Sequence, residues 1–354
     1  GVRLGPGTTI SESVATGSGR NDGGGAIGAV LCDVSLVGVH LTKNSATGNN
    51  GGAVLLGAGA QMNTTNGTTQ ADNRAQISGG AISCDGCAKL QLASGTKFEQ
   101  NVATTGDGGA IHVVSQNSQF IGNVAKKNGG AVYYSDVRAN TWKSDGDDYA
   151  GNSARTGSGG ALAIMHGAKV IFTATVDTVK SSCRENSADN GGGGCVFFSN
   201  NESDAADLLF SNNVAKYGKD KATSAHFLRL SSSISDKAIT VTSGAGFLKP
   251  PPRVTLLDSY LNIVLGQPAT GIEVTVRLVD SELAAGSGGV ASRCNISTGT
   301  AVFDTVGIRG DRGSGPHELA FTATISRSDD AGADVRRTIT ERGKPLYGTI
   351  EPLR

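Results

Sequence analysis

Cysteine is the residue type in this sequence with the clearest potential for chemistry. Six are present, and the sequence cannot choose among their pairings: Cys32, Cys84, Cys87, Cys183, Cys195 and Cys294. Cys183 and Cys195 occupy positions that are otherwise apolar. They are therefore either reduced core residues or a disulfide, and the sequence leaves both open.

Cys84 and Cys87 form a C-x-x-C motif in "CDGC". A zinc site would need a second cysteine pair or a histidine cluster, and neither accompanies this motif. Thioredoxin-like redox chemistry would need a β-α-β context, which is also missing. We therefore expect a local disulfide in a loop.

Acidic residues are the second source of chemistry, because polysaccharide lyases and hydrolases need clustered carboxylates with a basic residue or Ca²⁺. The first 200 residues contain only three glutamates, Glu12, Glu99 and Glu185, and the aspartates mostly mark turns. No carboxylate recurs at one register. The five histidines are scattered, and no Ser-His-Asp or Cys-His spacing emerges. We expect no catalytic residue and no cofactor.

The segment "SDGDDY" is the densest acidic stretch, with Asp145, Asp147 and Asp148. These carboxylates are either a Ca²⁺ site or a solvated loop. We favour the loop, because no EF-hand spacing follows. The sequence therefore predicts no metal site.

Four asparagines stand in N-x-Ser/Thr sequons: Asn63, Asn66, Asn201 and Asn295. A chain rich in Asn, Ser and Thr produces such sequons by chance. "NTTNGTT" nevertheless falls in a long insertion, where we expect an exposed glycan. Together with the cysteines, the sequons favour an extracellular or cell-surface setting.

The composition excludes several classes of protein. Lys plus Arg and Asp plus Glu number 31 each among 354 residues, so the net charge is zero. The chain therefore lacks the charge excess that would indicate binding to nucleic acid or to an anionic membrane. No apolar run approaches a transmembrane helix. The chain has 52 Gly but no three-residue period, which excludes collagen. It begins at Gly1, and we expect it to be part of a larger protein.

An internal repeat predicts the secondary structure that positions these residues. Gly-Gly-(Ala/Cys)-(Ile/Val/Leu) begins at Gly24, Gly51, Gly79, Gly108, Gly129, Gly159 and Gly193, at spacings of 27, 28, 29, 21, 30 and 34 residues. An Asn-x-Ala precedes most copies by six or seven residues, at Asn44, Asn73, Asn101, Asn123, Asn152 and Asn186, and returns at Asn213 in an altered eighth copy. Gly-rich disorder would not keep two motifs in phase.

This repeat predicts a β-solenoid of about seven to eight coils, stacked at the ~4.8 Å strand spacing. The residue three before each Asn, as in "FEQN" and "FIGN", should point into a narrow core. The Asn should form a corner, where it tolerates the left-handed conformation and bonds neighbouring coils. Gly-Gly should form the next corner, where a Cβ does not fit. Insertions such as "NTWKSDGDDY" should be loops, and "GVRLGPGTT" and "YGKDKATSAHF" should be caps.

"GGAI" paired with "FxxN" resembles the repeat of the chlamydial polymorphic outer membrane proteins and of large surface proteins of bacteria, algae and protists. The resemblance covers about residues 10–225. It implies a right-handed parallel β-helix with a surface, often adhesive, role. The family's membrane barrel is not evident here.

A Pro-rich boundary, "LKPPPR", precedes a change of pattern. "GIEVTVRLV", "GTAVFDTVGI" and "HELAFTATI" alternate with period two, which favours a β-sandwich. The order resembles the immunoglobulin-like modules of invasin- or filamin-type proteins. We thus expect an all-β chain, with a capped parallel β-helix at 1–248 and an immunoglobulin-like sandwich at 249–354.

The expected function is non-enzymatic. The chain would be a structural and interaction segment of a surface protein, assembling with itself, with protein partners or with glycans, without inserting into a membrane. If the source is algal, a cell-surface or ciliary appendage follows by family analogy. A bacterial adhesin passenger is the alternative, and a polysaccharide lyase or hydrolase comes third.

Overall fold

The structure is a computed structural model of the chain. It describes residues 1–19, 21–65, 67–85, 87–109, 115–116, 118–135, 141–166, 168–173, 180–199, 205–230, 250–266, 272–278, 290–304, 306, 319–328 and 334–342. These residues form strands and turns, with no helix among them, so the all-β prediction is confirmed. They divide into two compact units, Gly1–Thr223 and Ser224–Arg354.

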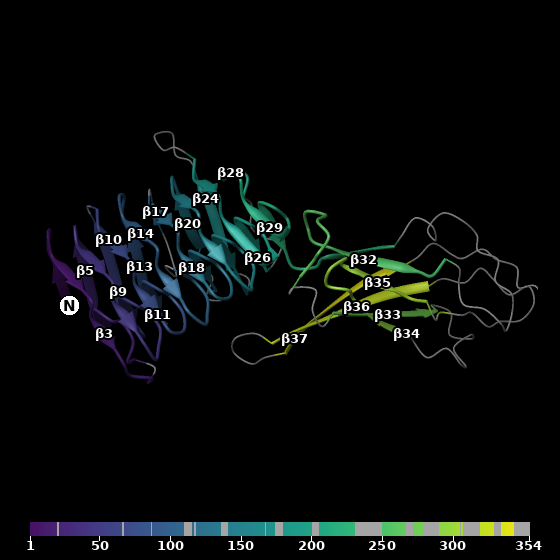
Figure 1. Ribbon diagram of the computed structural model, residues 1–354, viewed down its shortest axis with the longest axis horizontal. Helices are drawn as coiled ribbons and strands as arrows, with labels where there is room; N and C mark the ends of the chain where they lie inside the picture. The colour runs from purple at the N-terminus through teal and green to yellow at the C-terminus, as the bar shows by residue number, and fades with distance from the viewer. Residues whose placement is uncertain are drawn as a thin grey trace, which may run out of the picture. The chain divides into compact units, whose positions relative to one another are not determined.

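The first unit is a parallel β-solenoid of about seven coils, the architecture that the repeat predicts (Figure 1). Four strand positions recur along it, and equivalent strands stack into rows A to D. Row A consists of β1 (Val2–Leu4), β5 (Asp33–Val37), β9 (Gln61–Thr65), β13 (Lys89–Leu92), β16 (Ser115–Gln116), β20 (Thr141–Asp145) and β24 (Lys169–Thr173). Row B consists of β2 (Thr9–Ser11), β6 (His40–Thr42), β10 (Thr69–Ala71), β14 (Lys97–Glu99), β17 (Gln119–Ile121), β21 (Asp148–Ala150), β25 (Ser182–Arg184) and β28 (Leu209–Ser211).

Rows C and D complete each coil. Row C consists of β3 (Val14–Ala15), β7 (Ser45–Ala46), β11 (Arg74–Ala75), β15 (Val102–Ala103), β18 (Val124–Ala125), β22 (Ser153–Ala154), β26 (Ser187–Gly192) and β29 (Val214–Tyr217). Row D is described in two parts, β4 (Ile27–Ala29), β8 (Val54–Leu56) and β12 (Ile82–Cys84), then β19 (Val132–Tyr134), β23 (Leu162–Ile164), β27 (Val196–Phe198) and β30 (Lys221–Thr223). Residues 110–114 lie between the two parts, outside the described residues.

The core follows from alternation along rows A and B. In β5 and β9 the inward residues, such as Leu36 and Met62, are fully buried, while the residues between them face outward. Row D differs, because β8, β23 and β27 are buried on both faces. Their outward Leu55, Ala163 and Phe197 are at most 2% exposed, so these three coils bury apolar surface on both sides of row D.

The asparagine corner differs from the expectation in one respect. The left-handed residue is not the Asn but the residue before it, for example Lys43 (φ 57°), Gln100 (φ 52°) and Glu185 (φ 59°). The tight turn is made one residue earlier than expected. This leaves the Asn backbone N–H free to bond along the stack.

The two glycines of the next corner have different requirements. Gly159 has φ 72°, a conformation that costs other residues free energy. Gly160 has no positive φ, but a Cβ there would collide with the carbonyl oxygen of Gly194 in the following coil. The first glycine makes the turn, and the second permits coils to approach each other.

Two predicted insertions belong to the strands instead. Much of "NTWKSDGDDY" forms β20 and the start of β21, and "NTT" completes β9. The exposed Lys143 between the buried Trp142 and Ser144 is the strand signal that the polar composition concealed.

The described residues of the second unit form two antiparallel sheets. β31 (Phe227–Leu230), β32 (Arg253–Leu257) and β35 (Thr300–Val302) form one, and β34 (Val290–Arg293), β33 (Glu273–Leu278), β36 (Leu319–Ser328) and β37 (Asp334–Arg342) form the other. The rings of Phe303 and Phe321 lie 5.6 Å apart within its core. Because β31 pairs with β32, the second unit begins before the expected boundary at residues 248 and 249.

Candidate functional site

A column of seven buried asparagines runs along the solenoid at the corner between rows B and C. Its members are Asn44, Asn73, Asn101, Asn123, Asn152, Asn186 and Asn213, each at most 1% exposed. The Oδ1 of each, from Asn73 onward, accepts the backbone N–H of the preceding asparagine at 2.8–3.1 Å and its Nδ2–H at 2.9–3.1 Å. These bonds tie neighbouring coils together.

The remaining side-chain proton is also bonded. Each Nδ2 donates to a carbonyl of the preceding coil at 2.9–3.1 Å, as Asn73 does to Leu41 and Asn152 to Phe120. From Asn73 to Asn186 every amide makes all four of its possible bonds. All amides point the same way, so their dipoles add with the N–H end toward the last coil.

The column ends differently at its two extremities. At the first coil Ser13 takes the asparagine position, and its backbone N–H donates to Asn44 Oδ1 at 3.1 Å. At the last coil the Asn213 Nδ2 donates to Asp220 Oδ1 at 2.9 Å, within the same coil. Asp220 lies in the altered segment proposed as a cap. "GVRLGPGTT" instead forms β1 and leads into β2, strands of the first coil.

An inward column in row B supports the asparagines. The rings of Phe98 and Phe120 stack at 5.2 Å, and those of Phe120 and Tyr149 at 5.0 Å. Gln70 occupies the same column, fully buried beside Phe98. Neither side-chain polar atom of Gln70 has a hydrogen-bond partner among the described residues. It is a polar defect in an apolar stack.

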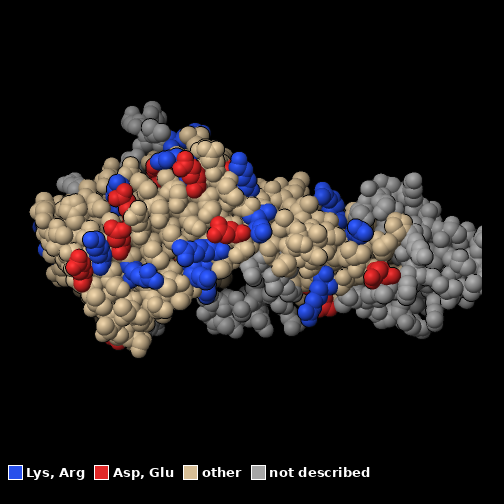
Figure 2. All heavy atoms as spheres, in the orientation of Figure 1, with Lys and Arg blue, Asp and Glu red and all other residues tan. Residues whose placement is uncertain are grey.

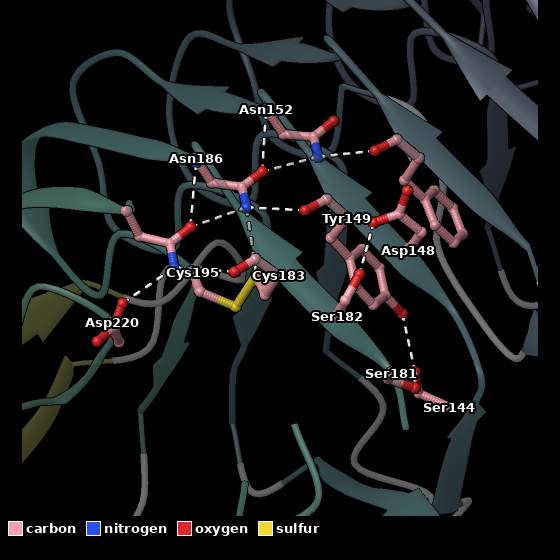
Figure 3. The surroundings of a disulfide bond; sticks show 12 residues. Ser144, Asp148, Tyr149, Asn152, Ser181, Ser182, Cys183, Asn186, Cys195 and Asp220 are labelled. Carbon is pink, nitrogen blue, oxygen red and sulfur yellow. Dashed lines mark hydrogen bonds between the residues drawn. A yellow bond between two sulfur atoms is a disulfide. The ribbon is translucent and has the colours of Figure 1, made fainter. Parts of the chain in front are cut away.

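Cys183 and Cys195 form a disulfide, with both residues fully buried (Figure 3). Cys183 follows Tyr149 in the inward column of row B, and Cys195 takes the alanine position after Gly193 and Gly194. The disulfide therefore links row B to the start of row D within one coil.

A second cross-coil column lies immediately before the Gly-Gly corners, and sequence reasoning missed it. The backbone N–H of each residue donates to the side-chain oxygen of its predecessor at 2.8–3.2 Å, through Asn50, Ser78, Asp107, Asn128, Ser158 and Gly192. The donors run opposite to those of the asparagine column. The recurrence of Asn, Ser and Asp before Gly-Gly was the available signal.

The acidic segment is not the solvated loop that the sequence suggested, because most of it forms β20 and the start of β21. Asp145 and Asp147 are 5% and 1% exposed. Asp147 Oδ1 accepts the Ser118 N–H at 2.8 Å, and Oδ2 accepts the Ser144 hydroxyl at 2.7 Å. Asp148 pairs with Arg184 at 3.1 Å. These bonds and this ion pair connect β20, β21 and β25 to their neighbours.

One Ser-His contact appears that the sequence did not suggest. Ser135 Oγ lies 3.2 Å from His166 Nδ1, and the backbone N–H of His166 donates to Ser199 Oγ at 2.8 Å. Among the described residues no carboxylate bonds the imidazole, as a nucleophile–base pair would require for orientation. The contact joins three successive coils.

The other cysteines fall into two classes. Cys84, the last residue of β12, and Cys87 form the second disulfide, and both are half-buried. Cys32 and Cys294 are free thiols. Burial raises the pKa of the Cys294 thiol to about 11, because the thiolate loses hydration there.

The structure describes the asparagines of two of the four sequons. Asn63 faces outward from the middle of β9, in a strand instead of the expected insertion. Asn295 lies exposed in the turn between β34 and β35, and its Oδ1 accepts the Ser297 hydroxyl at 2.6 Å. Asn66 and Asn201 lie outside the described residues.

The described residues contain no group of three or more His, Cys, Asp or Glu placed to hold a metal ion. A search of the same residues finds no helix long and apolar enough to span a membrane. Figure 2 shows acidic and basic side chains interspersed over one face of the first unit. The outward residues of row B also vary in type, through His40, Thr69, Lys97, Gln119 and Asp148.

Comparison with known proteins gives one family match. Residues 117–135 match the model of the Chlamydia polymorphic membrane protein (Chlamydia_PMP) repeat. The matched stretch spans β17 to β19, with Phe120, Asn123 and the Gly129–Gly130 corner. No curated protein and no solved structure matches the chain in the corresponding searches. The chain therefore carries a repeat similar to that of the Chlamydia polymorphic membrane proteins.

Proposed function

We propose that the chain is a non-enzymatic structural and interaction segment of a larger extracellular or cell-surface protein. The asparagine column is the observation that carries this proposal. The polar side chains that recur in every coil are buried and fully bonded between coils, from Asn73 to Asn186. The repeated chemistry of the sequence thus serves rigidity, and a changing outer surface is left for contacts.

The placement of carboxylates and nucleophiles supports a non-enzymatic role. Asp147 is bonded inside the solenoid, and the described imidazole of His166 lacks a carboxylate partner. A polysaccharide lyase or hydrolase needs carboxylates that reach a substrate.

A bacterial-type surface passenger is the second candidate, favoured by the repeat match at residues 117–135. In both candidates the solenoid projects from the surface and separates other parts of the protein. The second unit, proposed as immunoglobulin-like, acts as a spacer or contact module. Two disulfides favour an oxidising compartment. In the first candidate Asn63 and Asn295 carry glycans, and assembly is into a surface or ciliary appendage.

Three assays separate the candidates. A panel of polysaccharides is incubated with the chain, and reducing ends and unsaturated products are measured. Binding to cells and glycan arrays tests adhesion, and crosslinking in extracts of the source organism tests assembly with a fixed partner. The structural proposal expects no polysaccharide cleavage and a reproducible crosslinked partner. If a polysaccharide is cleaved, and the cleavage is lost on mutating one exposed carboxylate, the structural proposal is wrong and the chain is a polysaccharide lyase or hydrolase.

A further inference from the structure

An unusual group of residues lies where row D leads into row A, in the first half of the solenoid. Val30, Leu31 and Cys32 join β4 to β5. Two coils later Cys84 ends β12, and Cys87 lies between β12 and β13. Together we call these five residues the cysteine face. Both connections belong to the same turn position of the coil, because Cys32 precedes β5 as Ala88 precedes β13.

Leu31 is the first sign that this face serves more than folding. Its side chain is 80% exposed, and Val30 beside it is 41% exposed. The Leu31 backbone is left-handed, with φ 52°, whereas the neighbouring coil has Gly59 there, with φ 69°. A leucine in this conformation lowers the free energy of unfolding, and because the side chain is exposed, its burial does not offset that cost.

The same face holds a thiol and a disulfide that solvent reaches. Cys32 is free and half-buried, and Cys84–Cys87 closes a ring only three residues apart in sequence. The Cys183–Cys195 disulfide is by contrast fully buried. Cys32 and Cys87 are separated by two coils, roughly 10 Å along the stack. Cysteines that far apart cannot be bridged without backbone movement, so the thiol and disulfide of one chain do not react together.

We propose that the cysteine face binds a second copy of this chain and locks it covalently by thiol–disulfide exchange. Each copy supplies an apolar contact through Val30 and Leu31, a nucleophile in Cys32 and an acceptor in Cys84–Cys87. A second copy is the partner we propose, because it carries both the Cys32 thiol and the Cys84–Cys87 disulfide on the same face. The inference deepens the structural function proposed above by naming one partner, and it can fail while that function stands.

The step needs no oxidant. The Cys32 thiolate of one copy attacks the sulfur of Cys84 or Cys87 in the other, and the disulfide between those two breaks. A new disulfide forms between Cys32 and the attacked cysteine. The electron pair leaves with the second sulfur, which takes a proton from solvent. The numbers of thiols and disulfides are unchanged.

The test uses the full 354-residue chain, with intact Cys84–Cys87 verified by mass, at pH 8.5 in deoxygenated buffer with a metal chelator. We expect a disulfide-linked dimer on non-reducing gels and a peptide joining Cys32 to Cys84 or Cys87. Cys32→Ser and the double variant Cys84→Ser/Cys87→Ser should each abolish it, and Cys294→Ser should not. Absence of this dimer, or a dimer joined only through the two Cys32 residues, overturns the proposal.

A further variant tests the apolar contact separately from the chemistry. Leu31→Asn keeps a residue that tolerates the left-handed conformation but removes the apolar side chain. We expect dimer formation to slow by about tenfold, with folding unimpaired. Val14→Asn, at a 58% exposed valine outside the face, is the matched control and should leave the rate unchanged. Equal rates for Leu31→Asn and the unaltered chain would refute the apolar contact.

Discussion

The Asn213 Nδ2 donates to Asp220 Oδ1 at 2.9 Å, and this bond within one coil replaces the bond that each earlier asparagine makes to the next coil. Asp220 therefore supplies the acceptor that an additional coil would otherwise bring. It also places a carboxylate at the N–H end of a column of aligned amides, where negative charge is favourable. The column is closed at this end by a residue of its own coil.

Replacing Asp220 tests this closure. Asp220→Ala leaves a buried Asn213 proton without its acceptor, so we expect the first unit to lose about 1–2 kcal/mol. Asp220→Asn keeps an acceptor and should lose less. Trp142, the single tryptophan and 1% exposed, reports unfolding of this unit in a urea titration. Equal losses for Ala and Asn would show that the charge, and not the acceptor, is what matters.

The middle of the column should be more sensitive than its end. Asn123→Asp preserves the shape but turns the donor into an oxygen that faces the Phe98 carbonyl and Asn152 Oδ1, both acceptors. We expect a loss of about 3 kcal/mol or more at neutral pH, since a buried carboxylate is left beside two acceptors.

Gln119→Ala, at an exposed position of the same coil, is the control for Asn123→Asp and should change stability by less than about 0.5 kcal/mol. Both variants are followed by Trp142 fluorescence in urea. If Asn123→Asp matches the control, the amide bonds of the column contribute little to stacking.

The paired motifs of the sequence were sufficient to predict the solenoid, because Asn and Gly-Gly each meet a requirement that repeats in every coil. Asn101 and Gly108 could therefore be assigned to corners without any structure. The left-handed conformation at Gln100 could not be assigned, since Lys, Asp, Glu and Gly also occupy that position and share no type. The residue type at this position therefore does not predict the conformation.

Cross-coil partners were equally hard to predict. Asp147 looked like part of a polar loop, yet its carboxylate bonds the Ser118 N–H from the previous coil. Spacings that vary from 21 to 34 residues prevent the register between coils from being read off the chain. For the same reason Ser135 and His166 gave no signal in the sequence.

Gln70 offers a stabilising substitution. Its buried amide has no partner among the described residues, and it stands between Leu41 and Phe98 in the inward column of row B. Gln70→Leu should raise the free energy of unfolding by about 1–2 kcal/mol, because an unsatisfied polar group is replaced by an apolar one of similar size. Gln70→Ala, which leaves a cavity, is the comparison and should not stabilise. A loss in the leucine variant, measured by the same urea titration, would mean that water satisfies the amide.

The glycine corner predicts a contrast between two substitutions. Gly160→Ala places a Cβ against the Gly194 carbonyl oxygen, so the coils must separate, and we expect a loss of about 3 kcal/mol or more. Gly151→Asn puts a residue that tolerates φ 62° where nothing lies within 4 Å of a Cβ. That variant should remain within about 1 kcal/mol of the unaltered chain. Similar urea midpoints for the two would contradict the close-approach explanation.

Alkaline pH should destabilise the second unit through Cys294. Burial holds the pKa of its thiol at about 11 in the folded chain, against 9.0 for an ordinary cysteine. Above pH 9 the unfolded chain releases this proton while the folded chain keeps it, so the unfolded state is favoured increasingly until about pH 11. Folding stability is thus fully present below pH 9 and falls across this window. Pulsed alkylation of Cys294 at graded urea, read by peptide mass spectrometry at each pH, measures the effect. Cys294→Ala, followed by hydrogen exchange of β33 and β36, should lack this part of the pH dependence, and an identical alkaline slope in both chains would assign it to other groups.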